Sequence, residues 1–151
     1  MKIRDFLKLK GRQVITIGPN ETLLIAIQTL VENDIGALPV CNEKGILLGI
    51  ISERDLLKEC LQRSGAIGST KVQDAMTKKV AIGTPEDDLD YVTSVMKQER
   101  IRHLPIVVSQ KLEDIISMRD IVGFQLEETK AQIRYAGILS GRTHVGRQRL
   151  I

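Results

Sequence analysis

The chain is poor in aromatic residues and in cysteine. Its 151 residues include no tryptophan, two phenylalanines, two tyrosines and two cysteines. With so few aromatic rings, stacking can contribute little to any binding site. Cys41 and Cys60 form neither a Cys-x-x-Cys pair nor a disulfide framework, which favours a reducing cytoplasm. We expect both cysteines to be small buried side chains.

Membrane and secretion signals are also lacking. No apolar run approaches the roughly 20 residues needed to span a bilayer. The N-terminal sequence MKIRDFLKLKGRQV has no long apolar stretch of the kind that a secretory signal needs. The sequence therefore predicts a cytoplasmic protein that makes no membrane contact.

Signatures of catalysis and of nucleic-acid binding are scarce as well. The chain has no Gly-x-x-x-x-Gly-Lys phosphate loop, no His-x-x-x-His pair and no plausible nucleophile–base pair. A net charge of +3 is too small to indicate nucleic-acid binding by itself. We therefore predict no catalytic residues, no metal site and no catalytic cofactor. Nucleic-acid binding would rest on the basic C-terminal tail alone.

What the chain does contain is a long internal repeat. Residues 49–58 read GIISERDLLK, and residues 114–123 read DIISMRDIVG. The surrounding sequence aligns as well, so that Pro19 meets Pro85, with one single-residue gap further on. A period this long that occurs only twice argues for two similar halves, because a solenoid needs at least three stacked units.

Each half predicts the same order of elements: strand, helix, strand, strand, helix. An apolar stretch (residues 14–17 or 80–82) ends at a proline turn, and helical spacing follows in residues 23–31 or 89–96. Two further apolar runs then read as an antiparallel hairpin, and a serine opens the last helix.

The predicted fold class is α+β, with two pseudo-symmetric repeats packed around a central cleft. About 50 residues is marginal for an independent core, so the halves should pack on one another, and small ligands often bind at such interfaces. The expected segments are residues 1–62 for repeat 1 with an N-terminal segment, 63–71 for a linker, 72–124 for repeat 2, and 125–151 for a helix end and a basic tail whose glycines interrupt any helix.

The repeated phrase places Ser52 three residues before Asp55, and Ser117 three residues before Asp120. One interpretation is a helix capping box, although Glu or Gln is more usual than Asp at the third position. The other is a nucleotide site. A carboxylate can accept hydrogen bonds from both ribose hydroxyls, a helix N-terminus favours a phosphate, and a neighbouring arginine adds a charge-assisted clamp. From the residues alone, both interpretations stay open.

Taken in order, these motifs resemble tandem cystathionine-β-synthase (CBS) domains over roughly residues 5–124. The resemblance rests on DIGALPV and RIRHLPI, on the repeated phrase, and on VQDAMTKKV before the second half. The chain looks most like stand-alone bacterial CBS-pair proteins. The resemblance implies a module that usually dimerises and commonly binds AMP, ADP, ATP, NAD(H) or related adenosyl ligands in its central cleft.

Within this family pattern, the resemblance assigns the two Asp residues to ribose hydroxyls, with the two Ser residues beside them. The two Leu-Pro segments would form an apolar slot that offers backbone groups to adenine. The arginines and His103 would contact phosphate, although a solvated helix end for Arg102 and a structural role for His103 are about as plausible. The implied ligand-binding residues are Thr16, Ile17, Ile35, Ala37, Leu38, Pro39, Ser52, Arg54, Asp55, Thr84, Arg102, His103, Leu104, Pro105, Ser117, Arg119 and Asp120.

The two halves differ at one position of this pattern. Gly49 in the first half is replaced by Asp114 in the second, although the family favours Gly there. We therefore predict that the site built around Asp55 binds more tightly than the site around Asp120.

The function that these features predict is a regulatory module. An adenine nucleotide would bind between the repeats of a homodimeric protein, and a regulated partner protein would sense the resulting conformational change. The alternative is a structural homodimerisation module with vestigial clefts.

Overall fold

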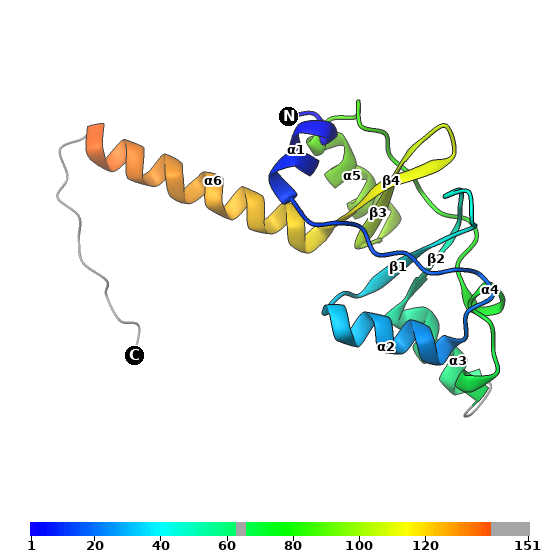
Figure 1. Cartoon of the computed structure of the whole chain (residues 1–151). Coiled ribbons are helices and arrows are strands. Elements are labelled where there is room, and N and C mark those ends of the chain that lie inside the picture. The colour runs from blue at the N-terminus through cyan, green and yellow to red at the C-terminus, as the bar shows by residue number, and fades with distance from the viewer. Residues whose placement is uncertain (63–65, 140–151) are drawn as a thin grey trace, which may run out of the picture.

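In the computed structural model, which describes residues 1–62 and 66–139, the chain forms two similar halves (Figure 1). The first half contains α2 (Leu23–Asn33), β1 (Ala37–Cys41), β2 (Leu47–Ser52) and α3 (Glu53–Gln62). The second contains α5 (Leu89–Glu99), β3 (His103–Val108), β4 (Lys111–Ser117) and α6 (Met118–Leu139). The predicted α+β class with two repeats is confirmed.

Each half has one antiparallel hairpin. Ala37 lies opposite Ser52 in the first, and His103 lies opposite Ser117 in the second. The expected first strand of each half is reduced to a single parallel bridge, of Ile17 to Val40 and of Gly83 to Ile106. A proline two residues after each bridging residue prevents pairing from continuing toward the C-terminus.

The two hairpins meet at their turns. Leu47 N–H donates to the carbonyl of Gln110 at 3.2 Å, and Leu112 N–H donates to the carbonyl of Gly45 at 3.1 Å. Gly45 and Gln110, whose carbonyls accept these bonds, both lie in tight turns with positive φ, at 80° and 69°. Backbone hydrogen bonds therefore join the halves directly.

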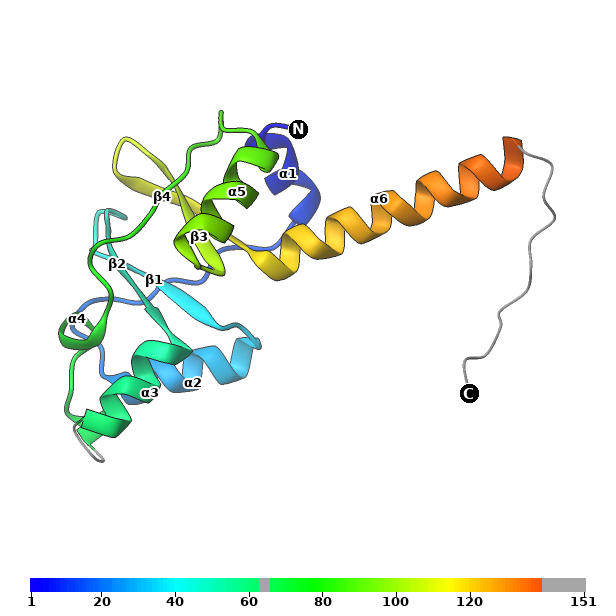
Figure 2. The same ribbon diagram turned by 180° about the vertical axis from the view of Figure 1, so that it is seen from behind.

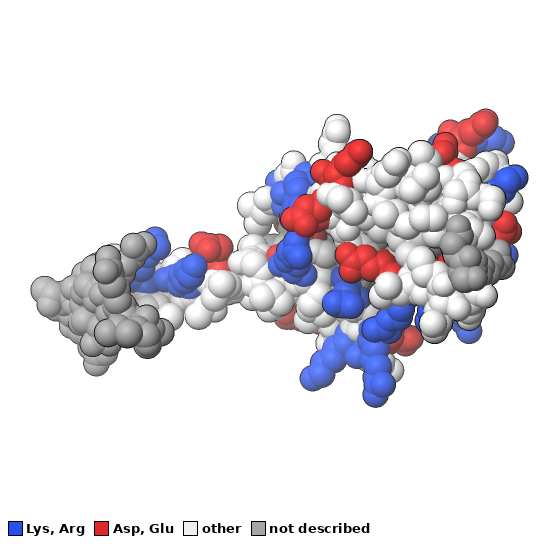
Figure 3. All heavy atoms as spheres, turned by 90° about the horizontal axis from the view of Figure 1, so that it is seen from below, with Lys and Arg blue, Asp and Glu red and all other residues white. Residues whose placement is uncertain are grey.

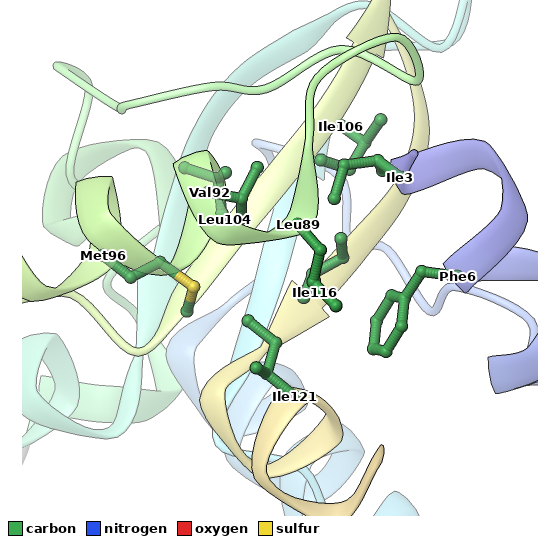
Figure 4. Packing of buried hydrophobic residues seen from close by; sticks show 9 residues of the cluster. All are labelled: Ile3, Phe6, Leu89, Val92, Met96, Leu104, Ile106, Ile116 and Ile121. Carbon is green, nitrogen blue, oxygen red and sulfur yellow. The ribbon is translucent and has the colours of Figure 1, made fainter. Parts of the chain in front are cut away.

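A pair of short helices is exchanged between the halves. α1 (Ile3–Lys10) precedes the first half in sequence, but its Ile3 and Phe6 lie in the core of the second half (Figure 4). α4 (Val72–Ala75) precedes the second half, but its Val72 is buried in the core of the first half. Each core is thus completed by the short helix that precedes the other half in the sequence.

The backbone hydrogen bonds that hold the exchanged helices repeat as well. Ile3 N–H donates to the carbonyl of Asp87 at 2.9 Å, and Val72 N–H donates to that of Glu21 at 2.8 Å. The pseudo-two-fold symmetry expected from the repeat therefore extends to these helices, which the sequence pattern did not predict.

The two cores are similar in size and composition. That of the second half draws on α1, α5, β3, β4 and α6 (Figure 4). The core of the first half contains Ile17, Leu23, Ala26, Leu30, Leu38, Val40, Ile51, Leu56 and Val72. Cys41 is buried as expected, and burial raises the pKa of its thiol. The same expectation is wrong for Cys60, which is exposed near the end of α3.

The last helix, α6, is much longer than its counterpart α3 and leaves the body of the molecule (Figures 1 and 2). It runs through Gly137, so the expectation that the glycines of the tail would interrupt the helix is wrong at this position. Residues 140–151 of the expected tail, and residues 63–65 of the expected linker, lie outside the described part. The rest of the linker includes a 3₁₀ turn, η1 (Ala66–Gly68). Among the described residues, no helix is long and apolar enough to cross a membrane.

Candidate functional site

Both repeated phrases form reciprocal helix caps. In the first half, the Ser52 N–H and Oγ donate to Asp55 Oδ2 at 2.9 and 3.0 Å, and the Asp55 N–H donates back to Ser52 Oγ at 3.4 Å. In the second half, Ser117 N–H donates to Asp120 Oδ2 and Asp120 N–H donates to Ser117 Oγ, both at 3.0 Å. The capping-box interpretation therefore describes both helix starts, even with the shorter Asp side chain.

The caps use only one carboxylate oxygen of each Asp. The second oxygen, Oδ1, is contacted by a residue that follows an exchanged helix. Thr77 Oγ1, beyond α4, donates to Asp55 Oδ1 at 3.1 Å. Arg12 Nη2, beyond α1, lies 3.3 Å from Asp120 Oδ1. In each carboxylate, Oδ2 therefore belongs to the helix cap, and Oδ1 contacts a residue of a connecting segment.

His103 marks the boundary between the halves. Its Cε1 would lie 3.4 Å from a Cβ placed on Gly36 of the first half. Burial lowers the pKa of His103 and the nearby Arg102 and Arg119 lower it further, while Asp120 and Glu53 act in the opposite direction. The structure therefore brings together charged groups from the start of α3, the start of β3 and the start of α6.

The apolar residues of the predicted site lie deeper than the polar ones. Leu38 and Leu104 are buried in their own cores, at 0% and 1% exposure. The carbonyls of Pro39 and Pro105 accept the bridge hydrogen bonds from Ile17 and Gly83. Any contact of the two leucines with a ligand would therefore come from the backbone, because their side chains are committed to the core. Ala37 is also buried, and Ile35 is partly buried.

The remaining predicted residues are at the surface. Thr16, Thr84, Arg54, Arg102 and Arg119 are exposed. The Thr84 N–H donates to Asp87 Oδ2 at 2.7 Å and so belongs to the turn before α5. Positive and negative groups lie close together over the body, as Figure 3 shows from below.

A cavity of about 360 Å³ lies between the halves. Residues of β2 and its turn line one side, and residues 78–82 with Val107 and Gln110 line the other. The lining is mainly aliphatic, and Lys78 is its charged member. None of the predicted site residues lines this cavity. It lies at the start of β2, next to the hairpin turn, whereas Ser52 is at the end of that strand. Its lining residues are Ile46, Leu47, Leu48, Gly49, Lys78, Val80, Ile82, Val107 and Gln110.

The difference between Gly49 and Asp114 has a structural cause. A Cβ at Gly49 would lie 2.6 Å from the Thr77 carbonyl oxygen and 2.8 Å from Met76 Sδ, so the segment after α4 fills that space. In the second half, the Asp114 carboxylate instead pairs with Lys10 at the end of α1, with 2.8 Å between Nζ and Oδ1. Lys10 Nζ also donates to the carbonyl of Ile115. Gly49 therefore leaves room for the segment after α4, and Asp114 pairs with the end of α1.

Sequence reasoning missed Arg12, Glu53 and Thr77. Thr77 lies in the motif VQDAMTKKV, which carried part of the family resemblance without receiving a role of its own. Arg12 had no local signal, because its partner Asp120 is 108 residues away. Within residues 1–62 and 66–139, no group of three or more His, Cys, Asp or Glu side chains is placed to hold a metal ion.

Two similar halves, joined by exchanged helices and carrying matching Ser-x-x-Asp caps at their boundary, define a duplicated α+β module. The family model described as "CBS domain" matches residues 4–62 and 72–127. The chain belongs to the CBS-domain family. The match points to no enzyme family, and proteins of this family are generally regulatory.

Individual relatives support this assignment. The CBS domain-containing protein YhcV of Bacillus subtilis is 32% identical over 119 residues, which cover 79% of this chain and 84% of YhcV. The crystal structure of the CBS-domain protein ATU1752 from Agrobacterium tumefaciens has a TM-score of 0.77 and 35% identity, and the match covers 83% of this chain and 99% of that one.

A second solved structure contains adenosyl ligands. The CBS domain pair of protein MJ0100, in complex with 5′-methylthioadenosine and S-adenosyl-L-methionine, has a TM-score of 0.73 and 25% identity. The match covers 82% of this chain and 98% of that one.

Proposed function

We propose that this protein is a regulatory module that binds an adenine nucleotide between its two halves and signals by a change in their relative arrangement. The observation that carries the proposal is the pair of matching Asp carboxylates, each fixed by its cap through one oxygen and contacted through the other by a connecting segment. The adenosyl ligands bound by the MJ0100 domain pair support an adenosyl ligand here.

In this proposal, the ribose hydroxyls bind Oδ1 of Asp55 or Asp120 and displace Thr77 or Arg12. A carboxylate whose other oxygen is already fixed is pre-organised, so little entropy is lost when the hydroxyls bind. Arg54, Arg102 and Arg119 lie exposed nearby and would bind the phosphates by charge-assisted hydrogen bonds. The basic groups favour AMP, ADP, ATP or NAD(H) over a ligand without phosphate.

The same contacts provide a route for signalling. Thr77 and Arg12 follow the exchanged helices, so a ligand that displaces them changes how each connecting segment is held. A shift in the position of the halves can result only if the ligand binds the two arrangements with different affinity. A regulated partner protein in the cytoplasm would then distinguish the two arrangements.

The test is thermal unfolding with AMP, ATP, NADH and S-adenosylmethionine, with GMP as the control. A ligand that binds only the folded state should stabilise it by about 2.7 kcal/mol at a hundred times its dissociation constant. Because the chain has no tryptophan and two tyrosines, retained adenine would also dominate the absorbance of the purified protein near 260 nm. If no adenine compound raises the melting temperature at millimolar concentration, the ligand-binding proposal fails.

A structural homodimerisation module is the second candidate. Large apolar side chains are exposed on several helices, among them Leu24, Ile25 and Val31 of α2 and Tyr91 of α5. The inward faces of the same helices are already buried in their own cores, through Leu23, Leu30, Leu89 and Met96. A second copy of the chain would cover the outward faces, and this homodimer is also part of our proposal for the regulatory module.

A further inference from the structure

We propose that Arg12 makes the site around Asp120 selective for a phosphorylated adenosine. The ribose hydroxyls displace its guanidinium from the Asp120 carboxylate, and a phosphate on the same ligand then binds it. This inference rests on the proposed function and names the ligand class that one of the two sites accepts.

The two connecting segments correspond residue by residue. The alignment of the two halves pairs residues 10–12 with residues 76–78, so that Arg12 corresponds to Lys78. Arg12 contacts the capping carboxylate of its half. In the other half Thr77 makes that contact, and Lys78 lines the cavity at the start of β2 instead. A cation therefore holds one carboxylate, and a neutral hydroxyl holds the other.

The segments are also fastened in different ways. Thr77 exchanges two backbone hydrogen bonds with Ile50 of β2, at 2.9 and 3.0 Å. Within the described part of the chain, no backbone pair joins Gly11 to Ile115, the counterpart of Ile50. There the Lys10 side chain provides the contacts to β4, among them one to the Ile115 carbonyl. The arginine that follows can therefore leave its carboxylate without breaking any backbone pairing.

The Arg12 side chain is placed to change partners. Its Nη2 lies 3.3 Å from Asp120 Oδ1, and within residues 1–62 and 66–139 this is the only hydrogen bond or ion pair of the guanidinium. The Arg12 side chain is 62% exposed, whereas that of Asp120 is 10% exposed. A single contact to an exposed guanidinium contributes little to stability. The other guanidinium nitrogens stay available to a phosphate, which this group binds through two parallel hydrogen bonds.

A nucleotide carries both replacement partners on one sugar. Its 2′- and 3′-hydroxyls bind the carboxylate, and its phosphate is attached at the 5′ position of the same ring. The displaced guanidinium therefore needs only side-chain rotation to reach the phosphate. Adenosine and 5′-methylthioadenosine have no phosphate, so they break the Arg12–Asp120 pair without replacing it. The sulfonium of S-adenosylmethionine would also repel the freed guanidinium.

The arginines of the repeated phrase do not create this selectivity. Arg54 directly precedes Asp55, Arg119 directly precedes Asp120, and both arginines are exposed. They offer the same charge to a phosphate in either half. Arg102 has no basic counterpart in the first half, so the experiment compares variants of a single site.

The experiment is calorimetric titration of the Asp55→Ala variant with adenosine and with AMP, because binding then falls mainly to the Asp120 site. Adding Arg12→Gln should lower the preference for AMP over adenosine by about tenfold, the effect of losing a charge-assisted contact to the phosphate. Adenosine itself should bind up to about fivefold more tightly, because the competing ion pair is gone. A merely structural loss would weaken both ligands. Lys78→Gln is the matched control, since it removes the same charge from the corresponding exposed position and should leave the preference unchanged.

Three results would overturn the role of Arg12 and leave the proposed function intact. They are an unchanged preference in Arg12→Gln, an equal change in Lys78→Gln, and AMP binding by the wild-type chain that is lost completely in Asp55→Ala. Absence of adenine-nucleotide binding by the wild-type chain would overturn the proposed function and this inference with it. Asp55→Asn keeps an acceptor for the Ser52 cap and replaces Asp55→Ala if the alanine variant does not fold.

Discussion

At the scale of single residues, the boundary between the halves depends on groups that differ between the two repeats. Gly49 is the clearest case, because the Thr77 carbonyl and Met76 occupy the space that a side chain would need. Gly49→Ala should therefore lower the free energy of unfolding by about 1–3 kcal/mol through overpacking. Gly68→Ala is the control, since nothing lies within 4 Å of a Cβ there. Equal melting temperatures for the two variants would contradict this explanation of Gly49.

The two carboxylates should also differ in their contribution to ligand affinity. Asp55 Oδ1 is held by a neutral hydroxyl, and Asp120 Oδ1 by the Arg12 guanidinium, which is the costlier partner to displace. Asp55→Ala should thus weaken AMP binding by roughly tenfold to a hundredfold, and Asp120→Ala by less. Calorimetric titration measures both, and Ser52→Ala controls for loss of the cap alone. A larger loss for Asp120→Ala would reverse the ranking.

His103 should make stability depend on pH. Burial and the neighbouring arginines lower its pKa in the folded protein, so between the ordinary value of 6.5 and that lowered value the unfolded chain binds more protons. The free energy of unfolding should accordingly fall as the pH drops through this interval. Denaturant titrations at about pH 7 and about pH 5.5 measure the fall, which His103→Gln should reduce. His144→Gln, at the chain's other histidine, is the control, and an unchanged fall in His103→Gln would contradict the assignment.

At the scale of elements, the Lys10–Asp114 pair fastens α1 to β4. Both side chains are mostly buried, at 9% and 16% exposure, so removing one partner leaves the other charge without compensation. Lys10→Met should cost about 3–5 kcal/mol, and Lys8→Met, on the exposed side of the same helix, should cost far less. Adding Asp114→Leu to Lys10→Met should recover most of the loss. No recovery would mean that the pair is not what holds the helix.

The elements that could be predicted from the sequence are those with a local cause. The helical spacing of Leu23 and Leu89, the turn residues between the strands, and the serines that cap α3 and α6 all act within a few residues of themselves. The start of α1 has no such signal, because its N-cap is Lys2, which makes no side-chain capping bond; only its end is marked locally, by Gly11 in the left-handed conformation. Its stability comes from Ile3 and Phe6 in a core formed some 80 residues later in the chain.

The same distinction applies to the candidate site. The caps of Ser52 with Asp55 and of Ser117 with Asp120 were predictable, because the repeat places the same Ser-x-Arg-Asp sequence at the start of both helices. The contacts of Arg12 and Thr77 depend on how the two halves pack, and that packing is set by long-range backbone pairing at the hairpin turns. The complete burial of the Leu38 and Leu104 side chains could not be predicted either, because a leucine in a strand is equally common at a cleft and in a core.

At the scale of the whole molecule, the two halves form one cooperative unit. Each core contains side chains contributed from both sides of the linker, so opening either half exposes apolar groups of the other. Thermal unfolding followed by circular dichroism and by calorimetry should give a single coincident transition. Two separate transitions would show that the exchanged helices contribute little to coupling.

The exchange of helices also bears on what happens if the chain is cut between its repeats. The N-terminal fragment would keep α1 without the core that receives it, and the C-terminal fragment would keep α4 in the same condition. Such fragments are complementary, so mixing them should rebuild the fold, as in a split reporter protein. A fragment kept alone could bury its own helix only by trading it with an identical copy. The internal pseudo-two-fold axis would then become a true two-fold axis between two identical fragments. A single repeat before gene duplication would have needed the same arrangement to complete its core.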